Sequence, residues 1–330
     1  MGGQLPAVVA RARNVVASAL DAASGPVFVG CSGGADSLAL AAAAGFLVQR
    51  RGYSVGALVV DHDLQAGSGF VAARAAEQCV ALGLSPVHVV KVSVSGGNEA
   101  DARAARYEAF ESFVGSSGTV LLAHTLNDQA EQVLLGLARG SGTRTLSGIP
   151  PVRGQYVRPF LSLTRADTEA ICRHAEVEFW VDPTNLSTDA LRNKVRLDVL
   201  PALADALGPD VVANLARTAD LTRDDADYLD SLAASAFASL TVSSLSFEVV
   251  LDLAQVSELP RALLSRVIRL AAVSVGGSAP SLERTQAVMR LLDLRPATGP
   301  VELEGHVNVI RTTLKPRTLV FRSSRSYSGD

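Results

Sequence analysis

The sequence contains little cysteine, and its cysteines are not spaced for cross-linking or zinc binding. Cys31, Cys79 and Cys172 are the three cysteines among 330 residues, and none belongs to a CxxC pair. An odd number at wide spacing argues against both a disulfide framework and a zinc site. We therefore expect three small, buried apolar side chains.

Long apolar runs and a large net charge are also missing. No stretch approaches the roughly 20 apolar residues that a membrane-spanning helix needs. Residues 1–20 form an amphipathic pattern that includes Arg11 and Arg13, not a signal peptide. These absences predict a cytoplasmic protein with no membrane partner. The net charge of -3 gives no sign of a nucleic-acid partner, so any RNA contact must use local patches.

The first half of the chain alternates short β-rich runs with helix-length segments. Strands are predicted at residues 27–30, 55–60, 86–92 and 119–123. This order is typical of an α/β fold with a doubly wound, mostly parallel sheet that is covered on both faces. Ligands bind beyond the carboxyl ends of such strands, so residues 32–37, 61–65 and 124–131 are expected to share one functional edge.

The second half is predicted to be richer in helix. Thr164 is expected to cap a helix that runs to about His174, and a helix over residues 190–200 is expected to stop near Pro201. A long helix or helix pair follows at 211–240, then helices at 261–275 and 282–294 and β segments at 301–310 and 318–321. The length favours two domains, which we place at 1–208 and, as a smaller helix-rich α+β part, at 209–330.

A glycine-rich turn between the first strand and the next helix carries the clearest functional signal. It reads Ser32, Gly33, Gly34, Ala35, Asp36 and Ser37. Its glycines let the backbone approach an anion, and the first helix N–H groups point at it. A carboxylate beside phosphate is repelled unless a divalent cation lies between them, so Asp36 predicts magnesium with the nucleotide. The alternative is an ordinary βα turn, since neither a Walker lysine nor a GxGxxG pattern is present.

The string SGGADS resembles the SGGxDS signature of the PP-loop ATP pyrophosphatases. Four further segments resemble the tRNA(Ile)-lysidine synthetase family, and the likeness covers residues 27 to about 203. They are VDHDLQ at 60–65, NEADARAARY at 98–107, AHTLNDQAEQ at 123–132, and DPTN at 182–185 followed by RN at 192–193 and LP at 200–201. The second segment is one residue shorter than the family pattern after Asn98. Asn127 stands where the family has the first Asp of a DD pair, and Gln132 stands where it has Thr.

The resemblance implies a two-step reaction that uses ATP and magnesium. The C2 carbonyl oxygen of the wobble cytosine, in a tRNA(Ile) with the anticodon CAU, attacks the α-phosphate of ATP, and pyrophosphate leaves. The ε-amine of free L-lysine then displaces AMP from C2. The resemblance also implies a tRNA-contacting role for residues 209–330, and we include a homodimer among the expectations.

The family motifs also imply roles for individual residues. The catalytic candidates are Asp36, His124, Asp128, Glu131 and Arg192, of which Asp36 and Asp128 would bind the metal. The nucleotide-binding candidates are Ser32, Gly33, Gly34, Ala35, Asp36, Ser37, Asp61 and His62. The candidates for substrate binding are Arg103, Arg106, Asp182, Asn185, Asn193 and Arg196.

Structural interpretations of the same residues stay open at this point. Asp128 and Glu131 at i, i+3 are also common on solvated helix faces, and His62 and His124 could be buried histidines. Arg192 and Arg196 could pair with Asp189 or Asp198 as an alternative to binding phosphate. The single tryptophan, Trp180, is expected to pack in a core.

The C-terminal segment has a basic run without an acidic residue. It consists of Arg311, Lys315, Arg317, Arg322 and Arg325. The run could bind the tRNA backbone or be a solvated strand face. Three alternatives to lysidine formation also remain: tRNA thiolation, amide formation by another PP-loop enzyme, and a non-catalytic ATP-binding module. The isolated cysteines argue against thiolation.

Overall fold

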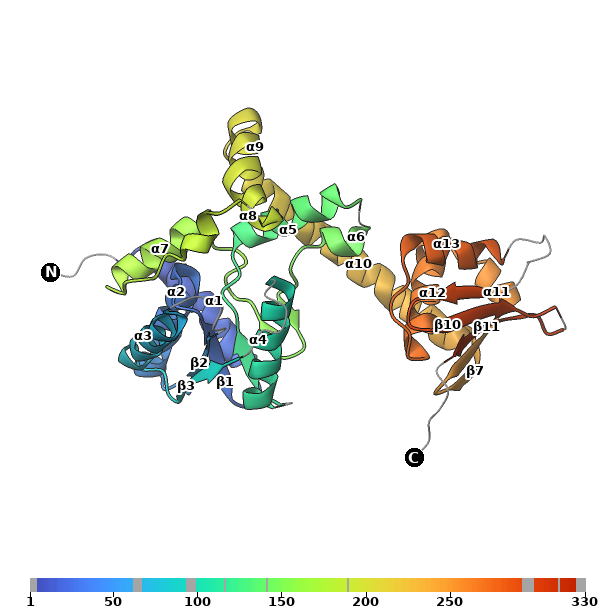
Figure 1. Cartoon of the computed structure of the whole chain (residues 1–330), viewed down its shortest axis with the longest axis horizontal. Helices are drawn as coiled ribbons and strands as arrows, with labels where there is room; N and C mark the ends of the chain where they lie inside the picture. Colours follow the sequence, from blue (N-terminus) through green and yellow to red (C-terminus); the bar gives the residue numbers. More distant parts are fainter. Residues whose placement is uncertain are drawn as a thin grey trace. The chain divides into compact units, whose positions relative to one another are not determined.

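The computed structural model describes residues 5–61, 67–92, 99–115, 117–140, 142–188, 190–292, 300–313 and 315–324. The chain forms two compact units, Met1–Arg223 and Asp224–Asp330 (Figure 1). Helix α10 (Val211–Leu240) contributes to both units. The functional division between residues 208 and 209 stays a prediction.

The first unit is built on a six-stranded sheet in the order β3-β2-β1-β4-β6-β5. Its strands are β1 (Val27–Cys31), β2 (Gly56–Asp61), β3 (Val87–Lys91), β4 (Thr119–Leu121), β5 (Val152–Arg153) and β6 (Tyr156–Val157). All neighbours pair in parallel except β5, which is antiparallel to β6. The predicted α/β fold with a mostly parallel sheet is confirmed.

Helices cover both faces of this sheet, as the alternation of apolar side chains requires. Val27 and Val29 of β1 belong to one core cluster, which includes residues of α1, α2, α3 and α7, whereas Phe28 belongs to another with Phe110 and Val114 of α4. The helices of this unit before α10 are α1 (Ala7–Asp21), α2 (Ala35–Arg51), α3 (Ser68–Ala81), α4 (Glu99–Val114), α5 (Leu126–Ala138), α6 (Thr143–Leu146), α7 (Arg165–His174), α8 (Leu191–Lys194) and α9 (Leu200–Leu207).

Two predictions of helix boundaries, one from a capping residue and one from a proline, can be compared with the structure. Thr164 caps α7 through a capping box with Asp167, and α7 ends at His174, so this prediction is confirmed. The expected stop near Pro201 is wrong, because a π-helical segment (Val195–Val199) leads directly into α9. Pro201 lies next to the junction between the π-helical segment and α9, so it does not end the helix.

The second unit packs helices against a five-stranded antiparallel sheet in the order β7-β8-β11-β10-β9. Its strands are β7 (Thr241–Leu245), β8 (Glu248–Asp252), β9 (Val301–Leu303), β10 (Val307–Arg311) and β11 (Thr318–Ser323), and its further helices are α11 (Leu253–Ser257), α12 (Arg261–Ser274) and α13 (Leu282–Arg290). Its core includes the fully buried Leu251, Ile268 and Phe321. The predicted helix-rich α+β part is therefore present.

Across the described residues, no single helix has the length and apolarity to cross a membrane. Two successive helical segments, Leu191–Leu207 and Val211–Leu240, together have the length and composition of a membrane span, but the chain bends by 100° between them.

Candidate active site

A cavity of about 450 Å³ opens at the carboxyl ends of β1, β2 and β4. Described residues from all three segments predicted to share this edge line the cavity, whereas residues 62–65 lie outside the described part of the structure. Ten of the polar, glycine and aromatic residues singled out in the sequence line it: Ser32, Gly34, Asp36, Ser37, Asp61, Arg106, His124, Asp128, Trp180 and Asp182. His62 and the side chain of Asn185 lie outside the described part of the structure.

The phosphate turn is held by bonds within itself. Ser37 Oγ accepts a hydrogen bond from the Ser32 backbone N–H at 3.1 Å and donates to the Gly34 carbonyl at 3.0 Å. Gly33 has a φ of 80°, a conformation that side chains disfavour. Gly34 precedes α2 and provides no side-chain cap, so the first N–H groups of α2 are available to an anion in the cavity.

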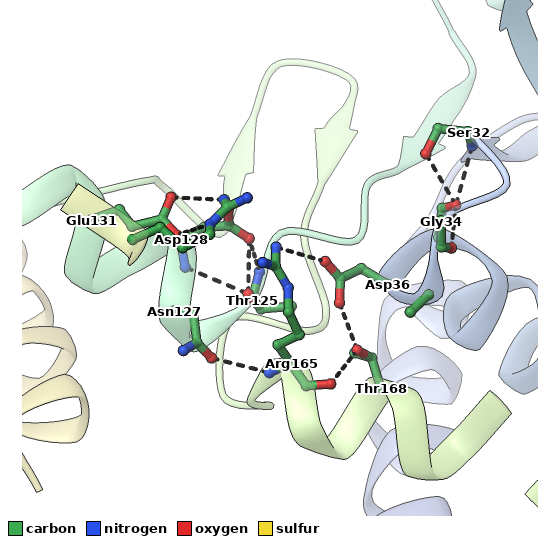
Figure 2. A network of polar contacts seen from close by, with 12 residues as sticks. Ser32, Gly34, Asp36, Thr125, Asn127, Asp128, Glu131, Arg165 and Thr168 are labelled. Atoms are coloured by element: carbon green, nitrogen blue, oxygen red, sulfur yellow. Dashed lines mark hydrogen bonds and ion pairs between the residues drawn. The ribbon is translucent and has the colours of Figure 1, made fainter. Parts of the chain in front are cut away.

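Asp36 lies in the first turn of α2 and is held by two residues of α7 (Figure 2). Thr168 Oγ1 donates a hydrogen bond to Asp36 Oδ1 at 2.5 Å, and Arg165 Nη2 lies 3.4 Å from Asp36 Oδ2. Burial raises the pKa of Asp36, although the hydrogen bond from Thr168 and the charge of Arg165 act in the opposite direction. This carboxylate is therefore a partly desolvated charge that a cation would stabilise further.

Two carboxylates of α5 are bound by two arginines from a distant part of the sequence. Arg192 donates to Glu131 Oε2 at 2.8 Å and to Asp128 Oδ1 at 2.9 Å, and Arg196 donates to Glu131 Oε1 at 2.6 Å and Oε2 at 2.9 Å. Glu131 is fully buried and Asp128 nearly so. The solvated-face interpretation of Asp128 and Glu131 is thus wrong, and the arginines pair with these carboxylates and not with Asp198. The other local candidate, Asp189, lies outside the described residues.

Asp128 also takes part in the N-terminal cap of α5, as the third residue of the helix. Its Oδ2 accepts hydrogen bonds from the backbone N–H of Thr125 at 2.7 Å and from the Thr125 hydroxyl at 2.8 Å, which forms a capping box. Burial raises the pKa of Asp128, but Arg192, His124 and these bonds outweigh burial and leave the pKa lower than usual. Asp128 is therefore ionised at neutral pH and presents negative charge at the wall of the cavity.

His124 follows β4 and lines the cavity. Its Nδ1 is buried and has no hydrogen-bond partner among the described residues. Burial lowers the pKa of His124 to about 4, against an opposing effect of Asp128, and the cations Arg158, Arg103 and Arg192 lower it further. The imidazole is thus neutral at pH 7, with one ring nitrogen as a donor and the other as an acceptor.

The remaining candidates divide into cavity residues and residues that shape the neighbouring backbone. Asp182 lines the cavity and caps the turn at Pro183–Leu186 through a bond from the Thr184 N–H at 2.9 Å. Asn193 donates to the carbonyls of Thr184 and Ser187 and so holds the same turn. Arg103 contacts the Tyr107 ring and hydroxyl. The expected core position of Trp180 is wrong, because this residue is half-buried and lines the cavity.

Magnesium in nucleotide sites is commonly held by one or two carboxylates together with the phosphates. Among the described residues, no cluster of three or more His, Cys, Asp or Glu side chains could hold a metal ion alone. Asp36 fits as a single carboxylate beside the phosphate turn. Asp128 is less exposed than Asp36, 11% against 23% of the side chain, and its two oxygens accept bonds of 2.7 to 2.9 Å from Thr125 and Arg192, so its predicted metal role has less support from the geometry.

Comparison with known proteins agrees with the geometry. Residues 7–203 match the family model of the PP-loop domain. The chain is 48% identical over 289 residues to a tRNA(Ile)-lysidine synthase of Leifsonia xyli subsp. xyli, which covers 86% of this chain and 87% of the relative. It is 43% identical over 290 residues to one of Streptomyces coelicolor, with 85% and 81% covered.

Among solved structures, the U34-tRNA thiolase NcsA from Methanococcus maripaludis superposes with a TM-score of 0.55 at 15% identity, covering 66% of this chain and 78% of that one. That likeness concerns the fold alone. Residues 7–203 are the PP-loop domain, and the extent of identity with the lysidine synthases assigns the family: the chain belongs to the tRNA(Ile)-lysidine synthases.

Proposed function

We propose that this chain uses ATP to join free L-lysine to C2 of the wobble cytidine in tRNA(Ile) with the anticodon CAU. It would thus be a ligase that forms a carbon–nitrogen bond. The observation that carries the proposal is the single cavity into which the phosphate turn, His124 and Asp128 all open. Family membership supplies the substrate class, and the cavity brings the required groups together.

In the first step the phosphate turn would hold the leaving pyrophosphate. Ser32, Ser37 and the uncapped N–H groups at the start of α2 supply hydrogen-bond donors for the charge that develops on it. Magnesium held at Asp36 would neutralise part of that charge. The C2 oxygen of cytosine then attacks the α-phosphate, and its electron pair forms the new phosphorus–oxygen bond.

In the second step the lysine amine must lose its proton before it attacks C2. A free lysine amine has a pKa of about 10.4 in water, so the pocket must bind the ammonium group and then accept its proton. Asp128 is ionised at the cavity wall and would bind the ammonium group, beside the neutral His124. Glu131, Arg192 and Arg196 form a cluster of ion pairs with Asp128 in which Glu131 is fully buried, and we propose that this cluster fixes the position of Asp128.

The remaining substrate contacts follow from the same placement. We propose that Arg106 and Asp182 contact substrate at the cavity wall and that Asn193 keeps Asn185 and its turn in place. Arg103 lies one helical turn before Tyr107 and would contact RNA from α4. Residues 209–330 would bind the body of the tRNA. The proposal includes a cytoplasmic location, where tRNA, ATP and lysine occur together, and a homodimer.

The test is mass analysis of tRNA(Ile) with a CAU anticodon after incubation with the protein, ATP, magnesium and isotopically labelled lysine. The expected product is lysidine at the wobble position together with AMP and pyrophosphate. ATP–pyrophosphate exchange that requires tRNA but not lysine would place adenylation first. Unmodified tRNA would refute the proposal. A thiolated base or a tRNA-independent exchange would favour another PP-loop adenylating enzyme, and ATP binding without exchange would favour a non-catalytic module.

A further inference from the structure

Helix α7 and the segment after it are bonded to three residues of the phosphate turn. Thr168 and Arg165 hold Asp36, and the Cys172 thiol donates to the Ala35 carbonyl at 3.3 Å. Beyond the helix, the backbone N–H of Trp180 donates to the Gly33 carbonyl at 2.9 Å. These contacts join residues about 130 to 150 positions apart, and their donors come from a short stretch of chain with no phosphate-binding motif of its own.

The start of α7 is fixed in turn by α5. The Asn127 side-chain oxygen accepts a hydrogen bond from the Arg165 backbone N–H at 3.0 Å (Figure 2). Arg165 is the first residue of α7, so its N–H has no partner within the helix. Asn127 therefore adds an acceptor beside the Thr164 cap. Asn127 thus helps to anchor the helix that holds Asp36, through an oxygen that an Asp at this position would also provide.

Thr168 is the central contact of this arrangement. It is fully buried, and its hydroxyl lies 2.5 Å from Asp36 Oδ1 and 2.8 Å from the Arg165 carbonyl. By contrast, the Asp36 and Arg165 side chains keep 23% and 35% of their surfaces exposed. A buried hydroxyl bonded to one oxygen of a partly exposed carboxylate restricts the rotation of that carboxylate, whose other oxygen lies 3.4 Å from Arg165 Nη2.

We propose that Thr168 is a positioning residue, and that α7 braces the phosphate turn so that Asp36 faces the cavity before ATP arrives. The inference rests on the proposed role of Asp36 with magnesium and ATP. Preorganisation of this kind lowers the cost of ordering the site when ligand binds. Arg165 contributes a positive charge beside Asp36 while no cation is bound there.

The experiment compares Thr168→Val, which keeps the shape and removes the hydroxyl, with Thr168→Ser, which keeps the hydroxyl. Trp180 is the only tryptophan and lines the cavity, so its fluorescence reports ATP binding without turnover. Thr168→Val is expected to weaken binding of ATP with magnesium about tenfold, as the loss of a hydrogen bond to a charged group implies. It should also raise the magnesium concentration at half-saturation. Thr168→Ser should stay within about twofold of the wild type.

Wild-type magnesium dependence in a folded Thr168→Val protein would overturn the proposal. An equal loss in Thr168→Ser would do so as well, because packing alone would then explain the effect. If Thr168→Val does not fold, Arg165→Gln removes the other contact from a partly exposed position, and an unchanged magnesium half-saturation there would overturn the proposal. The binding assay needs neither tRNA nor lysine, so failure to form lysidine would count against the proposed function and not against this inference.

Discussion

At the scale of single residues, the predicted catalytic carboxylates have very different surroundings. Asp36 keeps 23% of its side chain exposed and lines the cavity, whereas Glu131 is fully enclosed and bonded to two arginines. A carboxylate whose oxygens are both bonded inside the protein contributes to the shape and field of a site more than to contact with a ligand. The two residues should therefore respond differently to replacement.

We expect Asp36→Ala to abolish adenylation while the protein remains folded. The carboxylate is partly desolvated, and burial raises its pKa, so removing its charge should not unfold the domain. Loss of the cation site should lower ATP–pyrophosphate exchange by about 100-fold or more. Thermal melting monitored by circular dichroism is the control for folding. Near-normal exchange by a folded Asp36→Ala variant would refute the role of Asp36.

The lowered pKa of His124 predicts that the free energy of unfolding depends on pH. Its pKa is about 4 in the folded protein and 6.5 as a reference, so the unfolded chain takes up the proton first as the pH falls. The contribution of His124 to the free energy of unfolding is complete above pH 6.5 and is lost as the pH falls from 6.5 toward 4. At pH 5 the loss should be up to about 2 kcal/mol. Urea unfolding of wild type and His124→Gln at pH 7 and pH 5 measures the difference. Equal losses in both proteins would contradict the assignment.

At the scale of helices and strands, the sequence predicts elements with a clear period or a clear cap. The four strands at 27–31, 56–61, 87–91 and 119–121 and the capped start of α7 were predictable for this reason. The hairpin β7–β8 was missed because Thr241 follows α10 without a break. β5 and β6 were missed because two-residue strands have no measurable alternation. The π-helical segment before α9 depends on packing that no local pattern records.

Gly45 sets how closely α2 can approach the end of α3. A methyl group at this position would lie 2.2 Å from the Leu82 carbonyl oxygen. Alanine in a helix is usually more stable than glycine by about 1 kcal/mol, but here overpacking of roughly 1–3 kcal/mol should reverse the sign. We therefore expect Gly45→Ala to lower the free energy of unfolding, measured by urea titration.

Gly69, in the first turn of α3, offers a matched control for Gly45. A methyl group there would meet Asp61 Oδ2 at 3.5 Å, which is an ordinary contact. Gly69→Ala should therefore leave stability unchanged or raise it slightly. If Gly45→Ala raised stability as Gly69→Ala does, the close approach of α2 to Leu82 would be contradicted.

At the scale of the whole molecule, the site assembles from residues that lie far apart in sequence. The motifs predicted which residues approach the cavity, because parallel strands bring their carboxyl ends to one edge. They did not predict the partners of Arg192 and Arg196, because these guanidinium groups reach α5 from more than 60 residues away. Local acidic neighbours, such as Asp198, were the only partners that sequence proximity could suggest.

The basic residues of the C-terminal segment differ in whether their side chains already have partners within the protein. Arg322 forms an ion pair with Glu248 across the β8–β11 pair, and Arg311 donates to the Leu291 carbonyl at 3.0 Å. Arg325 lies outside the described residues. Lys315 and Arg317 are exposed, and within the described residues neither side chain has an ion pair or a hydrogen bond. The hypothesis of RNA backbone contact therefore rests best on these two cations.

If Lys315 and Arg317 neutralise tRNA phosphates, replacing both with alanine should weaken tRNA binding and lower the log–log salt slope by roughly 0.7 to 0.9 per lost contact. Binding is measured at several potassium chloride concentrations, with lysine and ATP affinities expected to stay the same. Arg322→Ala is the matched control, because Glu248 already neutralises that guanidinium and the slope should barely change. Phosphate contacts position RNA without reading bases, so discrimination between wobble cytosine and uracil should survive in the double variant. If a folded double variant keeps the wild-type salt slope and tRNA affinity, the hypothesis is refuted and the basic run is a solvated strand face.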